Sequence, residues 1–340
     1  MTNPISGFQN GFYLSESRQS AIPLAQNDEE PDDFRAILNR WVEERTPNFE
    51  DRQRAEQEIT EFLNDESKNI LNLSSFSLTS LPPIFNADPF IKRLTKLDIS
   101  RNHLTSLPAE IGRLQALQRL NVSKNHLTSL PAEIGGLQAL QELNVRSNRL
   151  TSLPAEIGRL QALQGLSVSS NHLTSLPAEV GRLQALQRLN VEVNQLTSLP
   201  AEIGRLQALQ WLSVSSNQLA SLPAEIGGLQ ALKHLWVPYN RLTSLPAEIG
   251  GLQALQGLDV SHNNTLTGVP REIFDLLSCC EITLDGVGFS EAVLARLRET
   301  CSANGYQGPR ISFSMEHAQQ AGPSGERSIE ELLGDLFRLV

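Results

Sequence analysis

The chain has 340 residues, of which 28 are basic and 38 are acidic, so its formal net charge is −10. This balance argues against a nucleic-acid binder, because such proteins concentrate positive charge, and no apolar run approaches the ~20 residues of a membrane-spanning helix. Leucine supplies 55 residues, whereas Phe, Trp and Tyr together supply 5%. A core made from one residue type used repeatedly indicates a repeat protein.

The first 31 residues are rich in Ser, Asn and Gln, with one Arg, no Lys and no periodic apolar face. They lack the basic and apolar regions of a conventional signal peptide. We therefore expect residues 1–31 to be disordered.

Residues 32–65 have the apolar spacing of two amphipathic helices separated at Pro47. We expect this pair to form a helical cap, because the first coil of a solenoid would otherwise leave its leucines in water. The apolar positions are Phe34, Ile37, Leu38, Trp41, Ala55, Ile59 and Leu63.

A unit of 23 residues with the pattern L-x-x-L-x-[VI]-x-x-N-x-L-x-x-[LV]-P then recurs eight times. Degenerate turns on both sides extend the predicted repeat region to residues 66–286. The copies begin at Leu94, Leu117, Leu140, Leu163, Leu186, Leu209, Leu232 and Leu255. The Asn column is Asn102, Asn125, Asn148, Asn171, Asn194, Asn217, Asn240 and Asn263.

Each copy predicts one coil of an α/β repeat solenoid. The alternation in Leu120-x-Val122 indicates a short strand with both side chains inward, and successive strands pair in parallel into a concave sheet. The Asn side chain turns the chain and bonds neighbouring backbone along a ladder. Proline followed by glycines, as in residues 131–140, predicts a short 3₁₀-like return on the convex side, where we expect the Glu and Arg columns to pair locally.

Two further segments follow the repeats. Residues 287–322 predict a C-terminal cap with one helix, and residues 323–340 predict a tail. Within that tail, Ser328 to Val340 has the length and apolar spacing of one short amphipathic helix.

Strand positions that point away from the core differ from copy to copy, whereas the Pro-Ala-Glu-[IV]-Gly-x-Leu-Gln-Ala-Leu segment recurs almost unchanged. Aromatic residues occur only in later copies, and basic residues gather in earlier ones. We interpret them as a partner surface, because aromatic and Arg side chains dominate binding hot spots; the alternative is that neighbouring side chains cover the tryptophans. The candidate residues are Trp211, His234, Trp236, Tyr239, Arg119, Lys124, Arg146 and Arg149.

Motifs for phosphate binding, zinc proteolysis and serine hydrolysis are absent from the sequence. We expect no catalytic residue, no metal site and no cofactor. The cysteines are Cys279, Cys280 and Cys301. They are too few and too close together to stabilise a chain of this length by disulfide bonds, which favours a reducing compartment. Aligned histidines follow the Asn column at His103, His126 and His172. Two of them could share a metal, but solvated surface histidines are the favoured interpretation.

The repeat pattern resembles the leucine-rich repeat over residues 71–286. A helical pair with Trp41, then Arg52-x-x-Ala55 and the stretch Leu71 to Pro82, resembles the entry to the repeat domain of type III secreted effectors, notably IpaH-type ubiquitin ligases and repeat effectors of plant pathogens. The stretch Tyr306-x-Gly-Pro-Arg-Ile-x-Phe-Ser314 resembles the segment that closes those domains. Residues 1–31 resemble their unfolded secretion signal, whereas the Cys-x-Asp motif of the ligases is absent.

The resemblance implies a noncatalytic recognition protein, secreted by a type III system into the host cell cytoplasm, that binds a host protein on its concave face. One alternative is the substrate-recognition half of a split or truncated ubiquitin ligase, whose catalytic domain lies in a separate or deleted chain. A second alternative is a resident intracellular signalling scaffold. None of these interpretations requires nucleic-acid binding or membrane insertion.

Overall fold

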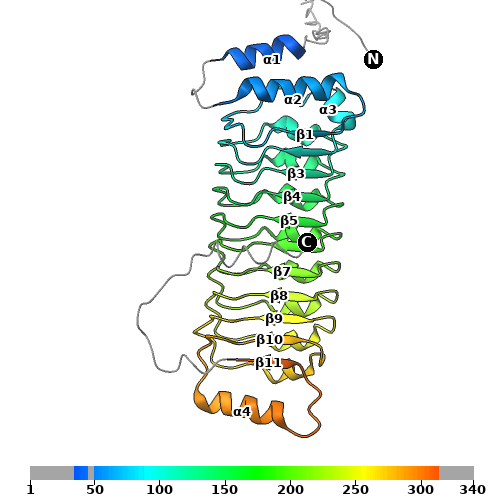
Figure 1. The fold of residues 1–340 in the computed structure, drawn as a ribbon. Coiled ribbons are helices and arrows are strands. Elements are labelled where there is room, and N and C mark those ends of the chain that lie inside the picture. Colours follow the sequence, from blue (N-terminus) through cyan, green and yellow to red (C-terminus); the bar gives the residue numbers. More distant parts are fainter. Residues whose placement is uncertain (1–33, 45–49, 87, 314–340) are drawn as a thin grey trace, which may run out of the picture.

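The computed structural model describes residues 34–44, 50–86 and 88–313. Its centre is one sheet of 11 parallel strands in chain order, with a helix across each end (Figure 1). The predicted α/β repeat solenoid with a parallel sheet is therefore confirmed. The strands are β1 (Ile70–Asn72), β2 (Lys96–Asp98), β3 (Arg119–Asn121), β4 (Glu142–Asn144), β5 (Gly165–Ser167), β6 (Arg188–Asn190), β7 (Trp211–Ser213), β8 (His234–Trp236), β9 (Gly257–Asp259), β10 (Glu281–Thr283) and β11 (Arg310–Ser312).

Adjacent strands pair without a shift in register. Leu120 lies beside Leu97 on one side and Leu143 on the other, so each inward leucine stacks on its copy in the next coil. Leu120 and Val122 are both fully buried, as the alternation predicts. The apolar core is a continuous column that runs the length of the solenoid, because each coil covers the leucines of the coil before it.

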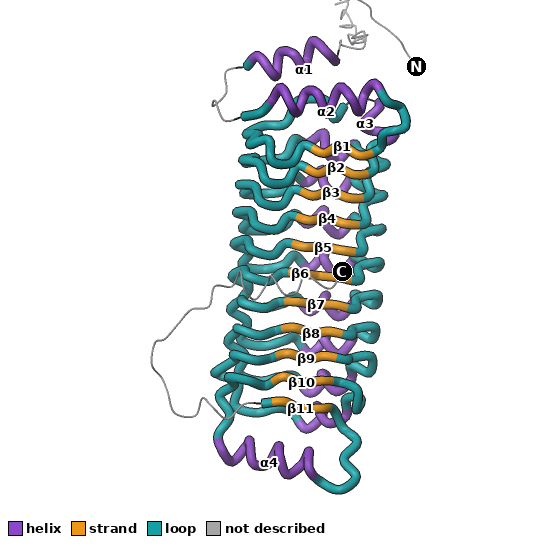
Figure 2. The backbone as a smooth tube through the Cα atoms, viewed as in Figure 1, coloured by secondary structure: helices purple, strands orange, loops and turns teal. Residues whose placement is uncertain are grey.

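The chain returns on the opposite side through five-residue 3₁₀ helices, which alternate with the strands along the tube in Figure 2. This is the predicted return, and proline immediately precedes each of them. They are η1 (Ala109–Arg113), η2 (Ala132–Gly136), η3 (Ala155–Arg159), η4 (Ala178–Arg182), η5 (Ala201–Arg205), η6 (Ala224–Gly228), η7 (Ala247–Gly251) and η8 (Arg271–Asp275).

Close packing between the 3₁₀ helices explains why their sequence barely changes. A Cβ placed on Gly158 would lie 2.5 Å from the carbonyl oxygen of Glu179 in the next coil, which is closer than atoms approach. Local pairing of the Glu and Arg columns was a wrong prediction, since no ion pair between described residues joins them. Exposed pairs of long side chains gain little free energy. Instead, the Gln161 amide donates to the carbonyls of Gly158 (2.8 Å) and Arg182 (3.2 Å).

The buried asparagines form the predicted ladder. The Asn171 amide donates to the carbonyls of Val145 (3.1 Å) and Val168 (3.0 Å), and its oxygen accepts from the backbone N–H of Leu150 at 3.0 Å. The Val168 carbonyl also accepts from Asn194 in the next coil, so neighbouring asparagines share each carbonyl. The ladder therefore satisfies the backbone groups of the turns that sheet pairing leaves over.

The N-terminal end of the core is covered by α1 (Phe34–Glu43) and α2 (Arg52–Asn64), with α3 (Asp88–Arg93) behind them. Leu38 and Trp41 of α1 are buried. In α2 the buried position near the C-terminal end is Phe62, whereas the predicted Leu63 is only partly buried. Phe62 stacks on the Phe90 ring of α3 at 5.0 Å, which closes the core on that side.

Arg52 ties α1 to α2 and to the first coil. Its guanidinium lies 4.6 Å from the centre of the Trp41 ring, donates to the Trp41 carbonyl and forms an ion pair with Glu50 at 2.6 Å. It also donates to Ser80 Oγ at 3.1 Å. Arg52 is buried with its charge paired, so the cap is held by polar contacts as well as by apolar packing.

At the other end, α4 (Glu291–Ser302) lies across the last coils and buries Leu297, and β11 extends the sheet by one strand. The predicted domain limits at residues 31, 65, 286 and 322 stay predictions. Residues 1–31 and 323–340, with the secretion signal and the amphipathic tail assigned to them, lie outside the described residues.

Candidate partner-binding face

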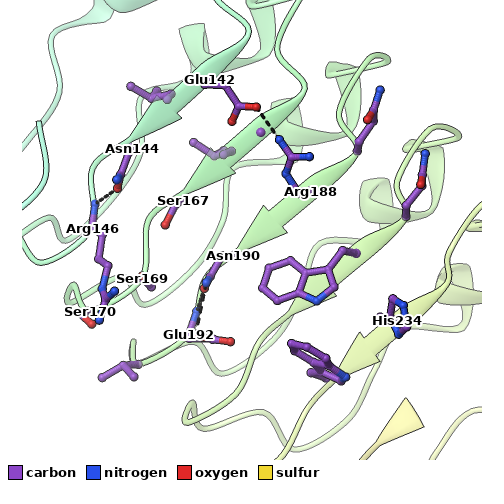
Figure 3. Close-up of a pocket in the computed structure, with 18 of the residues that line it drawn as sticks. Glu142, Asn144, Arg146, Ser167, Ser169, Ser170, Arg188, Asn190, Glu192 and His234 are labelled. Atoms are coloured by element: carbon purple, nitrogen blue, oxygen red, sulfur yellow. Dashed lines mark hydrogen bonds and ion pairs between the residues drawn. The ribbon is translucent and has the colours of Figure 1, made fainter. Parts of the chain in front are cut away.

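The outward positions of β4 to β8 surround a hollow of about 970 Å³ on the concave face (Figure 3). Its floor is the coil of β5, where the outward residues are Gly165, Ser167 and Ser169. Larger side chains stand on both sides, from β4 and its following turn and from β6 to β8. The hollow exists because one coil carries only small residues between coils that carry large ones.

An ion pair crosses one edge of this hollow. Arg188 Nη2 in β6 lies 2.5 Å from Glu142 Oε1 in β4, so the pair spans the intervening coil (Figure 3). A Cβ on Gly165 would lie 2.0 Å from the Glu142 carboxylate. Glycine at this position therefore makes room for the bridge.

A second acidic side chain lies further along the same coil as Arg188. Glu192 accepts a short hydrogen bond from Ser213 Oγ, which in turn lies 3.0 Å from Ser215 Oγ. The next residue, Val193, has φ of +51°, a left-handed conformation that a β-branched side chain adopts only with strain. Glu192 and Val193 both line the hollow.

The predicted aromatic group is partly brought together. The Trp211 and Trp236 rings meet edge to face with centroids 5.2 Å apart, and His234 lies 6.1 Å from the Trp236 ring. All three line the hollow. The two tryptophans are half-buried rather than fully exposed, because each covers part of the other.

Tyr239 lies outside the residues that line the hollow. It is 48% exposed, and its ring stacks on His262 of the next coil at 4.3 Å between centroids. Its φ of +55° places it in the turn after β8, where the chain leaves the sheet. Tyr239 is therefore a neighbour of the aromatic pair and not part of it.

The four predicted basic residues do not converge on one point. Arg146 lines the hollow and extends toward Ser169 and Ser170 (Figure 3). Arg119 is exposed on β3, and Lys124 and Arg149 are exposed in turns. Only Arg146 joins the aromatic group around the same hollow.

Sequence reasoning missed the polar part of the hollow. Glu142 and Arg188 stand in the same outward column as Trp211, so their direction was predictable, but their pairing across a coil was not. A glycine in that column, flanked by opposite charges two coils apart, is the signal that could have revealed it. The missed lining residues with polar side chains include Glu142, Ser169, Arg188, Asn190, Glu192 and Lys233.

Two aligned histidines are in contact at the edge of the early coils. His103 Nδ1 lies 3.2 Å from His126 Nε2, and the rings stack at 5.3 Å. Partial burial, then the positive charges of Arg149 and His103, lowers the pKa of His126 below its usual value. Among the described residues, no group of three His, Cys, Asp or Glu side chains is placed to hold a metal ion.

The surroundings of Cys280 do not activate its thiol. Cys280 is fully buried in the last coils, and burial raises the pKa of its thiol to about 12, with smaller effects from Cys279 and Glu281. A thiol with a raised pKa is a poor nucleophile near neutral pH.

Within the described ranges, no helix combines the length and the apolar character needed to cross a bilayer.

This geometry defines a leucine-rich repeat solenoid. The family model described as leucine rich repeat matches residues 92–150, 161–219 and 209–264, which lie within the predicted repeat region. No curated protein sequence matches the chain. A leucine-rich repeat domain suggests protein–protein recognition.

Two solved leucine-rich repeat structures are similar to this chain. The leucine-rich repeat domain of the type III effector XCV3220 (XopL) is 26% identical with a TM-score of 0.61, over 74% of this chain and 95% of that one. The ectodomain of the Arabidopsis thaliana membrane receptor kinase GASSHO1/SCHENGEN3, in complex with CASPARIAN STRIP INTEGRITY FACTOR 2, is 35% identical with a TM-score of 0.58. That match covers 67% of this chain, which spans only 28% of the receptor chain.

Proposed function

We propose that this protein is a noncatalytic recognition effector that binds a host protein on its concave face. The observation that carries the proposal is the hollow over β4 to β8, which combines an apolar wall at Trp211 and Trp236 with charged groups at the other side. Half-buried aromatic side chains beside paired charges are the features that concentrate binding energy at protein interfaces.

Delivery by a type III system is the finer part of the proposal. It is supported by the likeness to the XopL repeat domain, of which this chain covers 95%, and by the Ser-rich, Lys-free composition of residues 1–31. A fusion of residues 1–50 to a reporter enzyme should reach the host cytoplasm from a type III competent strain. The same fusion should stay behind in a strain that lacks the secretion ATPase. Equal host signal from both strains, or none from either, would favour the resident scaffold.

Substitution of the aromatic pair should weaken partner binding. Trp211→Ala and Trp236→Ala should each cost about 2 kcal/mol of binding free energy, roughly thirtyfold in Kd, because each removes a large ring from the wall of the hollow. The check is affinity for the captured partner by calorimetry, together with thermal unfolding of each variant.

Two kinds of variant serve as controls for that measurement. Arg159→Ala and Arg182→Ala alter exposed side chains on the 3₁₀ side and should change binding by less than about 0.5 kcal/mol. Tyr239→Ala, outside the hollow, should have a smaller effect than either tryptophan. Full affinity after removal of both tryptophans would indicate that the partner binds instead at the exposed basic residues near Arg119.

Ubiquitin transfer should be absent from the purified chain. No Cys-x-Asp motif occurs in the sequence, and the thiol of Cys280 is buried with a raised pKa. A reconstituted assay with E1, E2 and ubiquitin should show no autoubiquitination above the chain-free control. Transfer that disappears on substitution of Cys279, Cys280 or Cys301 would contradict this expectation. Activity only after addition of a separate ligase-domain chain would support the alternative of a recognition half.

A further inference from the structure

The hollow has the length of a short helix. It extends from β4 to β8, and four strand spacings of about 4.8 Å give about 19 Å along the solenoid. A helix of 13 residues is about 20 Å long. A helix of that size can cross the strands from β4 to β8, passing over the small residues of β5 and placing one face against the tryptophan wall.

The chain itself contains a segment with the matching apolar pattern. Residues 328–340, outside the described part, have the sequence Ser-Ile-Glu-Glu-Leu-Leu-Gly-Asp-Leu-Phe-Arg-Leu-Val. At 100° per residue its apolar side chains fall on one side and its charged side chains on the other. The apolar side would contact Trp211, Trp236 and Val193. Its members are Ile329, Leu332, Leu333, Leu336, Phe337, Leu339 and Val340.

The described chain leaves the fold at a position from which this segment reaches the hollow. Phe313 follows β11, and β6 at the middle of the hollow lies five strand spacings away, about 24 Å. Fourteen residues separate Phe313 from Ser328, and a random coil of 14 residues has a root-mean-square end-to-end distance of about 21 Å. A linker that matches its span gives an effective concentration in the millimolar range.

The net charges of the segment and of the hollow have opposite signs, which favours long-range attraction although the carboxylates lie on the side away from the apolar face. The charged residues that line the hollow are three basic and two acidic, a net charge of +1. Residues 328–340 carry three carboxylates, at Glu330, Glu331 and Asp335, against one Arg. Within the hollow, Glu142 is paired with Arg188 and Glu192 accepts from Ser213. The basic side chains of Arg146 and Lys233 stand on opposite sides of it.

We propose that residues 328–340 of the same chain bind in the concave hollow as a helix and occupy the surface that a partner would use. Binding in cis makes the free face accessible only when the segment leaves. This intramolecular binding needs no external partner, so its test is independent of the test of the proposed function.

Amide hydrogen exchange of the full-length chain tests the occupant. Residues 328–340 should exchange at least tenfold more slowly than an unstructured peptide of the same sequence, independent of protein concentration. Leu336→Asp, which places a charge on the apolar side, should abolish that protection. Gly334→Asp adds the same charge on the opposite side and should keep it. Random-coil exchange in the unmodified chain, or protection that grows with concentration as for a second copy, would overturn the proposal.

Variants of the hollow test the site. Trp236→Ala should release the segment and return its exchange to the level of Leu336→Asp, whereas Tyr239→Ala, which lies outside the hollow, should not. Acrylamide should quench the fluorescence of the Leu336→Asp chain more strongly than that of the Gly334→Asp chain, because Trp211 and Trp236 become exposed while Trp41 stays buried. Protection of residues 328–340 that survives Trp236→Ala would place the segment elsewhere and refute this site.

Discussion

Replacing Asn171 by Leu should destabilise the solenoid by about 2 to 4 kcal/mol. The Asn171 amide makes three donor contacts, to the carbonyls of Val145, Val168 and Ser169, and accepts from the Leu150 N–H. The two valine carbonyls keep a second asparagine donor, but the buried Leu150 N–H loses its partner, and an orphaned buried donor costs about 1 to 3 kcal/mol. The lost Asn171 hydrogen bonds, which join its own coil to the preceding one, add the remainder.

Urea denaturation followed by circular dichroism measures this effect. Because coils contact only their neighbours, a weakened central coil should also broaden the transition or split it in two. Thr174→Ala, three residues away and exposed, is the matched control and should change stability by less than about 0.5 kcal/mol. A single sharp transition at the unmodified midpoint for Asn171→Leu would show that the ladder contributes no stability.

Trp41→Ala should cost about 3 to 5 kcal/mol, the second large effect expected. The Trp41 ring is 4% exposed within the N-terminal helical pair, and the Arg52 guanidinium lies over it. Its removal leaves a cavity and takes away the cation–π contact of a buried charge. Hydrogen exchange should then rise in α1 and α2 before the central coils open.

The control for this measurement is Asn39→Ala, an exposed position on the same helix. It should leave the unfolding midpoint within about 0.5 kcal/mol of the unmodified chain. If Trp41→Ala behaves like Asn39→Ala, the helical pair does not stabilise the first coil, and its interpretation as a cap is wrong.

The ring–ring contacts of the tryptophan and histidine side chains could not be predicted from the sequence. The alternation within each strand predicts Trp211 and Trp236 on the concave side, and both lie there. Their edge-to-face contact, and the stacking of His103 on His126, depend on rotamers that the repeat pattern does not specify. Exposure was overestimated for the tryptophans because each lies within reach of the other on adjacent strands.

The repeat pattern predicted the solenoid, its parallel sheet, its 3₁₀ returns and its asparagine ladder. This was possible because each coil makes the same local contacts with its neighbours, so the structure predicted for one repeat applies to all repeats. Contacts between outward side chains could not be predicted in the same way, because they depend on the fold. The Glu142–Arg188 bridge joins residues 46 positions apart and needs the missing side chain of Gly165 between them. The hollow therefore depends on three successive coils together, a relation that no single repeat contains.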